Sequence, residues 1–388
     1  MIAPGIHRFL MMERVVHGRP AAAALVEEVE RLERRQVLVV TNRSLAKSTL
    51  LADFGASLGG RYAGCFSGVT AHGPRRCVID GAEAARAAGA DLLVAVGGGS
   101  VIDAAKVMQL CLRHDIRDPA GLSEYSGRGR GDPSTRPADA DRWIRIVAIP
   151  TTLSAAEFTW FGGASDPERG VKEPFAHPMM IPQVVIMDPA MTAETPMHLL
   201  LTTGMKAVDH AAERLAALNA NPYNDAVSSL ALQLLSAGLR TAHRDPADMG
   251  ARGDLQYGAF MSMCGSWSGV AVGLCHAIGH ALGAHCAVPH GETSCTLLPS
   301  VMRWNAGANG ARQALIAEAL GAREGDAGNA LADLISKLGL PTRLRDVGAS
   351  RDAFPAIAQK ALGDVLTKNN PRPVRSTGDI EEILEMAW

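Results

Sequence analysis

Residues 92–111 read LLVAVGGGSVIDAAKVMQLC, and this stretch decides the fold. Leu92 to Val96 is a continuous apolar run, which is typical of a strand buried on both faces of a parallel sheet. It runs directly into Gly97-Gly98-Gly99-Ser100, after which Val101 to Cys111 is predicted to be helical. Glycines let a ligand approach the backbone closely, and a helix N-terminus offers free N–H groups and a positive dipole end. We therefore predict an anion site suited to pyrophosphate, with a tight turn that binds nothing as the alternative.

Further apolar runs occur before residue 190, at 37–41, 144–149 and 184–187, with helical patterns at 20–33 and 82–90. Strands that alternate with helices predict a doubly wound α/β sheet. Beyond Thr192 only helical patterns remain, at residues 197–218, 225–240, 255–282, 310–319 and 328–338. The predicted fold class is an α/β doubly wound nucleotide-binding domain over residues 1–190, followed by an all-α domain over residues 191–388.

The composition excludes several classes of protein. A length of 388 residues, with 47% hydrophobic and 20% charged residues, is that of a soluble globular protein of two domains. A formal net charge of −2 offers no surface for nucleic acid, so no nucleic-acid partner is expected. Seven cysteines without regular spacing argue against a disulfide scaffold and favour a reducing, cytoplasmic location. Met261 to Leu282 is apolar enough to resemble a membrane span, but its histidines and small residues favour a buried core helix, so no membrane partner is expected.

Histidines gather in one window, Cys275 to Glu292, which reads CHAIGHALGAHCAVPHGE and holds four of the twelve in the chain. His276 and His280 are four residues apart among small apolar neighbours, so they should share one face of a buried helix. Pro289 is expected to end any helix and to leave His290 in a turn. Converging imidazoles build metal sites and proton relays, whereas a lone histidine is usually a hydrogen-bonded core residue. Imidazole suits zinc, iron, copper and nickel alike.

A lysine and a histidine, Lys206 and His210, share one helix face in the segment TGMKAVDHAAERL. A helical lysine is usually solvated, but the apolar neighbours here favour burial beside His210.

Polar residues also follow the predicted strands. Thr151 and Thr152 follow the strand 144–149, on the side of the sheet where ligands bind, and could add hydroxyl contacts. Asn42 follows the strand 37–41, where an acidic residue would hold an adenosine ribose, and Arg43 could pair with a 2′-phosphate.

With these motifs in place, the sequence resembles the iron-containing (group III) alcohol dehydrogenases, which share a fold with dehydroquinate synthase and glycerol dehydrogenase. The matching segments, in the family's order, are GGGSVIDAAK at 97–106, PTTLSAAEFT at 150–159, VVIMDP at 184–189, GMKAVDHAAE at 204–213 and HAIGHALGAHCAVPHGE at 276–292. The compact PTTLSAAE and the ending NPRPVRSTGDIEEILEMAW at 370–388 are most similar to the maleylacetate reductase branch.

The resemblance implies hydride transfer in a cleft between the two domains. It assigns the pyrophosphate loop to Gly97, Gly98, Gly99 and Ser100, and further cofactor contacts to Thr151, Thr152 and Lys172. It also implies that His210, His276 and His290 match three of the four metal ligands of metal-dependent members. His280 matches the histidine near the nicotinamide, which is often placed in the proton path.

Lys206 departs from the family pattern, because metal-dependent members carry Asp there and maleylacetate reductases usually carry Asn. An ammonium beside a divalent cation puts like charges together, so no catalytic metal is expected. We expect an NAD(P)-dependent oxidoreductase, a homodimer, that acts on a small anionic carbonyl or activated alkene through Lys206, His210, His276, His280 and His290. The alternatives are a metal-dependent alcohol dehydrogenase, a lyase of the dehydroquinate synthase kind, and a ligand-binding protein that has lost catalysis.

Overall fold

The computed structural model describes residues 6–71, 73–127, 132–167, 169–322 and 326–388. The chain divides into two compact units, one of Arg8–Glu194 and one of Thr195–Trp388 with Ile6 and His7. The first unit contains a parallel sheet flanked by helices, and the described residues of the second contain helices and no strand. The predicted fold class is confirmed.

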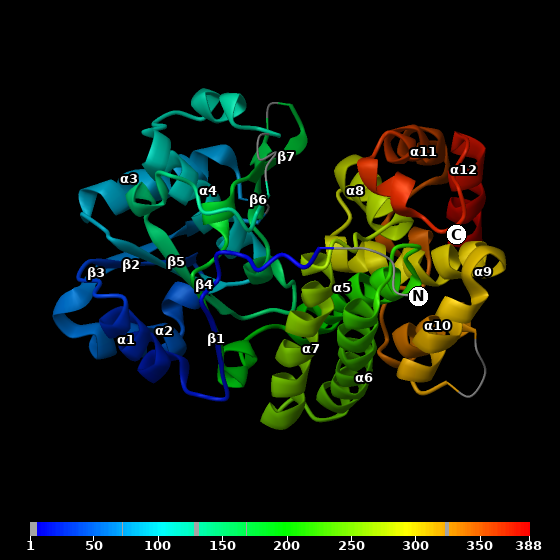
Figure 1. Ribbon diagram of the computed structural model, residues 1–388, viewed down its shortest axis with the longest axis horizontal. Coiled ribbons are helices and arrows are strands. Elements are labelled where there is room, and N and C mark those ends of the chain that lie inside the picture. Colours follow the sequence, from blue (N-terminus) through cyan, green and yellow to red (C-terminus); the bar gives the residue numbers. More distant parts are fainter. Residues whose placement is uncertain (1–5, 72, 128–131, 168, 323–325) are drawn as a thin grey trace. The chain divides into compact units, whose positions relative to one another are not determined.

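Six parallel strands form the sheet of the first unit, in the order β1-β8-β5-β4-β2-β3 (Figure 1). They are β1 (Arg14–His17), β2 (Val37–Asn42), β3 (Tyr62–Val69), β4 (Leu92–Gly97), β5 (Arg145–Pro150) and β8 (Val184–Met187). A separate antiparallel hairpin pairs β6 (Phe161–Asp166) with β7 (Val171–Ala176). The four runs predicted as strands are β2, β4, β5 and β8. The edge strands β1 and β3 lack a continuous apolar run, because their side chains are only partly buried.

The apolar run in β4 is explained by burial on both faces of the sheet. Leu93 and Ala95 pack into one hydrophobic core with helices α3 (Arg75–Ala87) and α4 (Gly99–His114). Leu92, Val94 and Val96 pack into the other core with α1 (Ala21–Arg31) and α2 (Thr49–Leu58), which lie across the sheet from α3 and α4 (Figure 1). Successive side chains of a strand point to opposite faces, so both sets must be apolar.

The order of the strands reverses between β2 and β4. The chain leaves β2 for the edge strand β3 and returns to β4 on the other side of β2. In doubly wound sheets, ligands bind outside the carboxyl ends of the strands at such a reversal. The residues at the carboxyl ends of β2, β4 and β5 are Asn42, Gly97 and Pro150, and Thr151 follows directly. Apart from Lys172, the predicted cofactor residues therefore lie at the carboxyl ends of three neighbouring strands.

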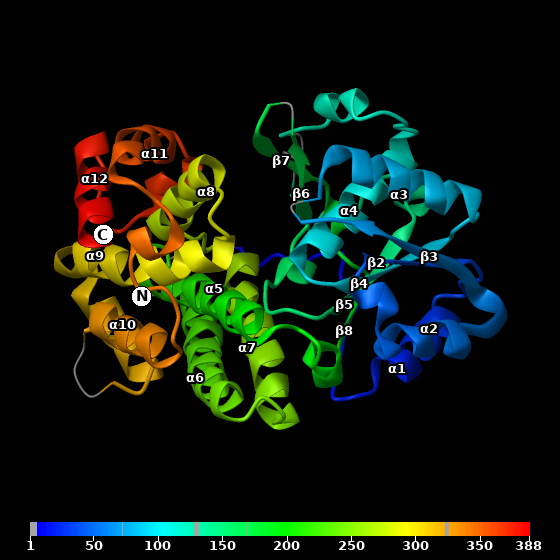
Figure 2. The same cartoon turned by 180° about the vertical axis from the view of Figure 1, so that it is seen from behind.

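The second unit consists of helices (Figure 2). They are α5 (Met197–Ala216), α6 (Pro222–Arg244), α7 (Met249–Trp267), α8 (Leu274–Cys286), α9 (His290–Ala319), α10 (Ala327–Lys337), α11 (Phe354–Leu362) and α12 (Thr377–Met386). Figures 1 and 2 show α9 beside both α10 and α12. Within the described ranges, no helix has the length and apolar character needed to cross a membrane.

Two sequence predictions about these helices are wrong. The expected helix over 255–282 is two helices, α7 and α8, because the segment between them turns at Gly269, whose φ of 79° is left-handed. His290 does not lie in a turn but is the first residue of α9, with Pro289 as the cap. A proline just before a helix loses no intrahelical hydrogen bond, so it starts this helix rather than interrupting one.

A buried pair of charged residues lies behind the hairpin of the first unit. Lys106 on α4 is fully buried, and its ammonium donates to the carbonyls of Ala156 and Phe161 at 2.6 and 2.9 Å and to Thr159 Oγ1 at 2.8 Å. Glu157 is also buried, and its Oε2 has no hydrogen-bond partner among the described residues. Burial raises the pKa of Glu157 to about 7 and lowers the pKa of Lys106 to about 8.

We predict that Glu157 makes folding less favourable as the pH rises. A carboxyl group whose pKa is about 7 in the folded chain, against 4.5 ordinarily, binds more protons when folded, so stability falls between these two pH values. The Glu157→Gln variant removes this dependence and should gain stability over the wild type by at most about 3 kcal/mol between pH 5 and pH 8. Thermal unfolding across this range measures the difference, and parallel pH curves for variant and wild type would contradict it. Glu124→Gln, on an exposed residue, is the matched control.

Candidate active site

In the first unit, the predicted phosphate-binding turn packs against the residues that follow strand β5. Gly98 is the N-cap of α4, and no side chain caps the first turn of that helix. A Cβ atom on Gly98 would lie 2.9 Å from Thr152 Cγ2. The backbone N–H of Thr151 donates to the carbonyl of Gly97 at 3.1 Å. The predicted residues Gly97, Gly98, Thr151 and Thr152 are thus brought together at a helix N-terminus, a geometry that binds anions.

Two other predicted cofactor residues already have partners in the structure. Lys172 on β7 pairs with Asp103 near the start of α4, with 3.0 Å between Nζ and Oδ2. Asn42 accepts through its side-chain oxygen from Ser44 Oγ at 2.7 Å and from the backbone N–H of Leu45 at 2.9 Å. Lys172 therefore lies beside the N-terminal part of α4, while Asn42 stabilises the turn that follows β2.

In the second unit, four predicted histidines come together from three helices. His210 lies on α5, and its ring stacks on that of His276 of α8 with centroids 4.9 Å apart. The ring of His290, at the start of α9, lies 5.9 Å from that of His276 and 5.4 Å from that of His280. His210 and His276 are buried, His290 is half-buried and His280 is exposed. The cluster therefore runs from the core of the helical unit to its surface.

Lys206 lies one helical turn before His210 on α5, and its side chain is half-buried. The pKa of His210 is well below its usual value, chiefly because of burial, and the nearby charges of His276, Lys206 and Arg214 lower it further. His210 is therefore a neutral imidazole at physiological pH. Its Nδ1 is buried and has no hydrogen-bond partner in the described part of the chain.

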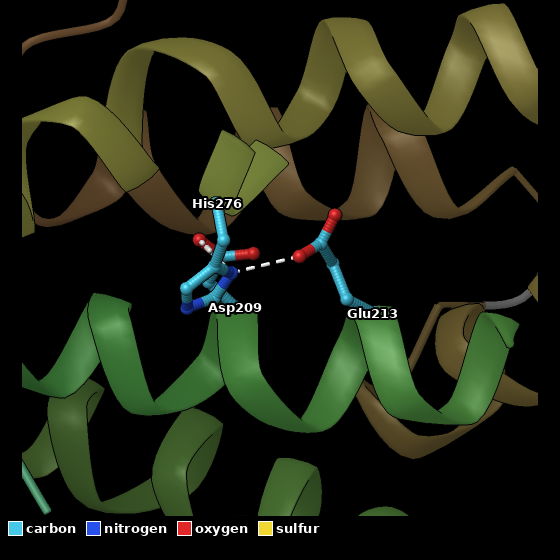
Figure 3. A group of neighbouring side chains, drawn as sticks. All are labelled: Asp209, Glu213 and His276. Carbon is cyan, nitrogen blue, oxygen red and sulfur yellow. Dashed lines mark hydrogen bonds and ion pairs between the residues drawn. The ribbon is translucent and has the colours of Figure 1, made fainter. Parts of the chain in front are cut away.

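Glu213 joins α5 to the start of α8. Its two carboxylate oxygens accept from the backbone N–H groups of Gly273 at 2.9 Å and Cys275 at 2.7 Å. Oε2 also accepts from His276 Nδ1 at 2.7 Å (Figure 3). Burial alone would raise the pKa of Glu213, but these hydrogen bonds hold it below its usual value. The carboxylate of Glu213 thus satisfies backbone N–H groups at the start of α8 that have no partner within the helix. It also orients the ring of His276 so that Nδ1 faces Glu213 and Nε2 points away from it.

Asp209, one turn before Glu213, has the opposite electrostatic character. Its Oδ2 accepts from Ser294 Oγ at 2.7 Å and from Cys275 Sγ at 3.2 Å, while Oδ1 has no partner among the described residues. Burial is the main cause that raises its pKa above the usual value, and the charge of Glu213 raises it further. The two carboxyl groups therefore differ: Glu213 is ionised, and Asp209 is pushed towards its neutral form.

Asp209, Glu213 and His276 are close enough to resemble a metal site, with their ligand atoms within 4.8 Å of one another. Figure 3 shows the two acids rising from α5 towards the His276 ring, which reaches down from α8. The oxygens of Glu213 are occupied by N–H donors, and the atom of His276 that faces them is Nδ1, the donor to Glu213. The carboxylate of Glu213 therefore serves to hold the ring of His276 in place through a hydrogen bond.

Three residues of the site, Asp209, Glu213 and Ser294, were not predicted from the sequence. A local signal existed for Glu213, which lies seven residues after Lys206 and three after His210, so it shares their face of α5. No local signal existed for Ser294, because its partner Asp209 is 85 residues away.

Both units of the chain match models of one family of oxidoreductases. Residues 13–189 match the family model described as iron-containing alcohol dehydrogenase, and residues 200–388 match the C-terminal model of the same family. The chain belongs to the iron-containing alcohol dehydrogenase family. Members generally use NAD(P) and often a metal.

Relatives with two different activities are similar to this chain to nearly the same degree. The chain is 33% identical to lactaldehyde reductase of Escherichia coli, over 98% of this chain and 100% of that protein. It is 31% identical to maleylacetate reductase 1 of Cupriavidus pinatubonensis, over 97% and 95%. The solved structure of maleylacetate reductase from Agrobacterium tumefaciens matches with a TM-score of 0.83 and 30% identity, over 100% of this chain and 99% of that one. The predicted family is confirmed, and the substrate is a separate question.

We predict that the two carboxyl groups of α5 respond differently to conversion into amides. Glu213→Gln removes the charge that satisfies buried N–H donors and should lower the free energy of unfolding by about 2 kcal/mol or more. Asp209→Asn, at a group already pushed towards neutrality, should cost less than about 1 kcal/mol. Chemical denaturation at neutral pH measures both variants. Equal losses would show that Glu213 does not hold α8 as its hydrogen bonds indicate.

Proposed function

We propose that the protein is an NAD(P)-dependent reductase of a small anionic carbonyl compound or activated alkene, similar to maleylacetate reductase, and that it works without a catalytic metal. The observation that carries the proposal is the position of Lys206, one turn before His210 on α5, where the family's metal ligand is expected. Its positive charge is among the causes that lower the pKa of His210.

The side chains of the histidine cluster do not fit a divalent cation. His210, His276 and His290 are imidazoles and supply no negative charge. Asp209 and Glu213 do not compensate, because Glu213 holds the Nδ1 edge of His276 and Asp209 lies at the same edge, 3.6 Å from Nδ1. An ammonium adds repulsion of ~4 kcal/mol per unit charge at ~4 Å and an effective dielectric of ~20, doubled for a divalent ion.

The same features suit an anionic substrate. An ammonium near the neutral imidazole of His210 can hold a carboxylate, or stabilise the negative charge that develops on a carbonyl oxygen during reduction. Lys206 thus supplies the positive charge that favours an anionic substrate and a developing oxyanion.

The glycine turn of the first unit fits a dinucleotide, since the uncapped N-terminus of α4 attracts a pyrophosphate and the buried Thr152 Oγ1 has no partner in the described residues. When bound, the reduced nicotinamide supplies a hydride to the substrate carbon. The oxygen of a carbonyl substrate, or the α-carbon of an alkene, then takes one proton. His280 is the exposed imidazole of the cluster and the natural source of that proton, which solvent replaces.

We predict that Lys206 replaces the metal. Purified wild-type protein should contain less than one equivalent of zinc or iron, and its reduction of maleylacetate with NADH or NADPH should survive chelators. Lys206→Met should lower kcat/KM on the order of 100-fold, because a fixed positive charge at the developing anion is lost. Lys360→Met, on an exposed lysine of α11, is the matched control and should leave the activity unchanged.

Lys206→Asp gives the complementary test of the metal. It restores the carboxylate that metal-dependent relatives carry, so the variant should bind zinc or iron more tightly than the wild type in elemental analysis. The proposal fails if the wild type holds a full equivalent of metal and loses its activity on chelation.

We predict that dinucleotide binding depends on the contact between Gly98 and Thr152. A methyl group on Gly98 would lie 2.9 Å from Thr152 Cγ2 and must displace the turn that follows β5. Gly98→Ala should therefore weaken the binding of NADH and NADPH at least tenfold in calorimetry, a loss of about 1.4 kcal/mol. Gly60→Ala, where a methyl group meets nothing within 4 Å, is the control. Unchanged affinity in a folded Gly98→Ala variant would move the dinucleotide away from this turn.

A further inference from the structure

His280 has a carboxylate partner from a distant part of the chain. Its Nδ1 lies 3.0 Å from Oδ2 of Asp364, which is 84 residues further along the sequence. The side chain of His280 is 47% exposed, whereas that of Asp364 is 23% exposed. His280 is therefore the one imidazole of the cluster that combines access to solvent with a fixed acidic partner.

Local hydrogen bonds hold the carboxylate of Asp364 in this orientation. Oδ1 accepts from the backbone N–H of Leu366 at 2.9 Å and so caps the short helix η10, Val365–Asn369. The other oxygen, Oδ2, is then directed at His280. Burial alone would raise the pKa of Asp364, but the hydrogen bonds from His280 and Leu366 hold it below its usual value. The group is a carboxylate at neutral pH and accepts from His280.

The segment that carries Asp364 is itself anchored to the helices around the histidines. Thr367 Oγ1 donates to the carbonyl of Ala361 at 2.6 Å, and Asn369 Nδ2 donates to the carbonyl of Val272, just before α8, at 3.1 Å. The amides of Asn370 and Asn305 exchange two hydrogen bonds, of 2.9 and 2.7 Å, and Asn305 belongs to α9. These bonds tie the segment to the two helices that carry His276, His280 and His290.

We propose that Asp364 is a positioning residue for the proton transfer by His280. The carboxylate fixes the proton of the neutral ring on Nδ1 and leaves Nε2 as the atom that exchanges protons with the substrate and with solvent. The inference rests on the proposed function, in which His280 supplies the proton. In each turnover the proton leaves Nε2 for the substrate, the neutral ring keeps its Nδ1–H bond to Asp364, and solvent returns a proton to Nε2.

A merely structural role can be separated from this one, because the two oxygens of Asp364 have different tasks. Serine caps a helix as well as aspartate does but does not reach His280, so Asp364→Ser keeps the cap and removes the contact. Asp364→Asn keeps both the cap and an oxygen that can accept from Nδ1. Asp326→Ser, at the N-cap of α10, reports the effect of the same substitution at a cap outside the cluster.

Turnover of maleylacetate with NADPH and NADH is the first measurement. Asp364→Ser should lower kcat on the order of tenfold while the KM for maleylacetate changes little, and Asp364→Asn should recover part of the loss. Asp326→Ser should match the wild type. In the His280→Ala background, Asp364→Ser should cause no additional loss, because the carboxylate then has no ring to orient.

The tautomer of His280 is the second measurement, and it needs no substrate. Nitrogen NMR of histidine-labelled protein, with His280 assigned from its absence in His280→Ala, should show the proton of the neutral ring on Nδ1 in the wild type. In Asp364→Ser the proton should move largely to Nε2. An unchanged tautomer, or wild-type kcat in Asp364→Ser beside an impaired His280→Ala, overturns the positioning role alone. Wild-type turnover in His280→Ala overturns the proton-donor role in the proposed function.

Discussion

The hydrogen bonds of the Glu213 carboxylate at the start of α8 are the interaction on which the histidine cluster of the helical unit depends. One side chain of α5 satisfies the backbone N–H groups of Gly273 and Cys275 and orients the ring of His276. A buried helix terminus without such a partner would leave N–H groups unpaired, at a cost of about 1–3 kcal/mol each. The same ionised group therefore docks two helices and decides which nitrogen of His276 is open to a ligand.

Charge is distributed unequally over the side chains around the histidine cluster. Glu213 is held ionised by its N–H donors, Asp209 is pushed towards neutrality, and His210 is held neutral by burial with help from Lys206. The only group of full positive charge proposed to face the substrate is the ammonium of Lys206. Relatives that use a metal place a cation at this position in the family pattern. A lysine supplies one fixed charge without needing an anionic ligand, and this difference supports an anionic substrate.

The predictions from sequence were most accurate where one segment determines its own structure. The run Leu92 to Val96 is a strand because burial on both faces requires apolar residues. The turn after it requires glycine because a Cβ atom on Gly98 would crowd Thr152. The spacing of Lys206 and His210 also placed them correctly on one helix. Predictions over longer ranges were weaker, since nothing local distinguishes one long helix over 255–282 from α7 and α8 joined at Gly269.

The sequence by itself determined the two-part architecture, the glycine turn and the set of imidazoles, because periodicity and residue type act over a few residues. Only the tertiary structure decided which imidazole is buried and which carboxylate serves each one. His276 and His280 lie four residues apart on one helix and have similar neighbours in the sequence, yet one ring lies in the core and the other at the surface. Their partners, Glu213 and Asp364, lie 63 and 84 residues away, and such pairings depend on how helices pack.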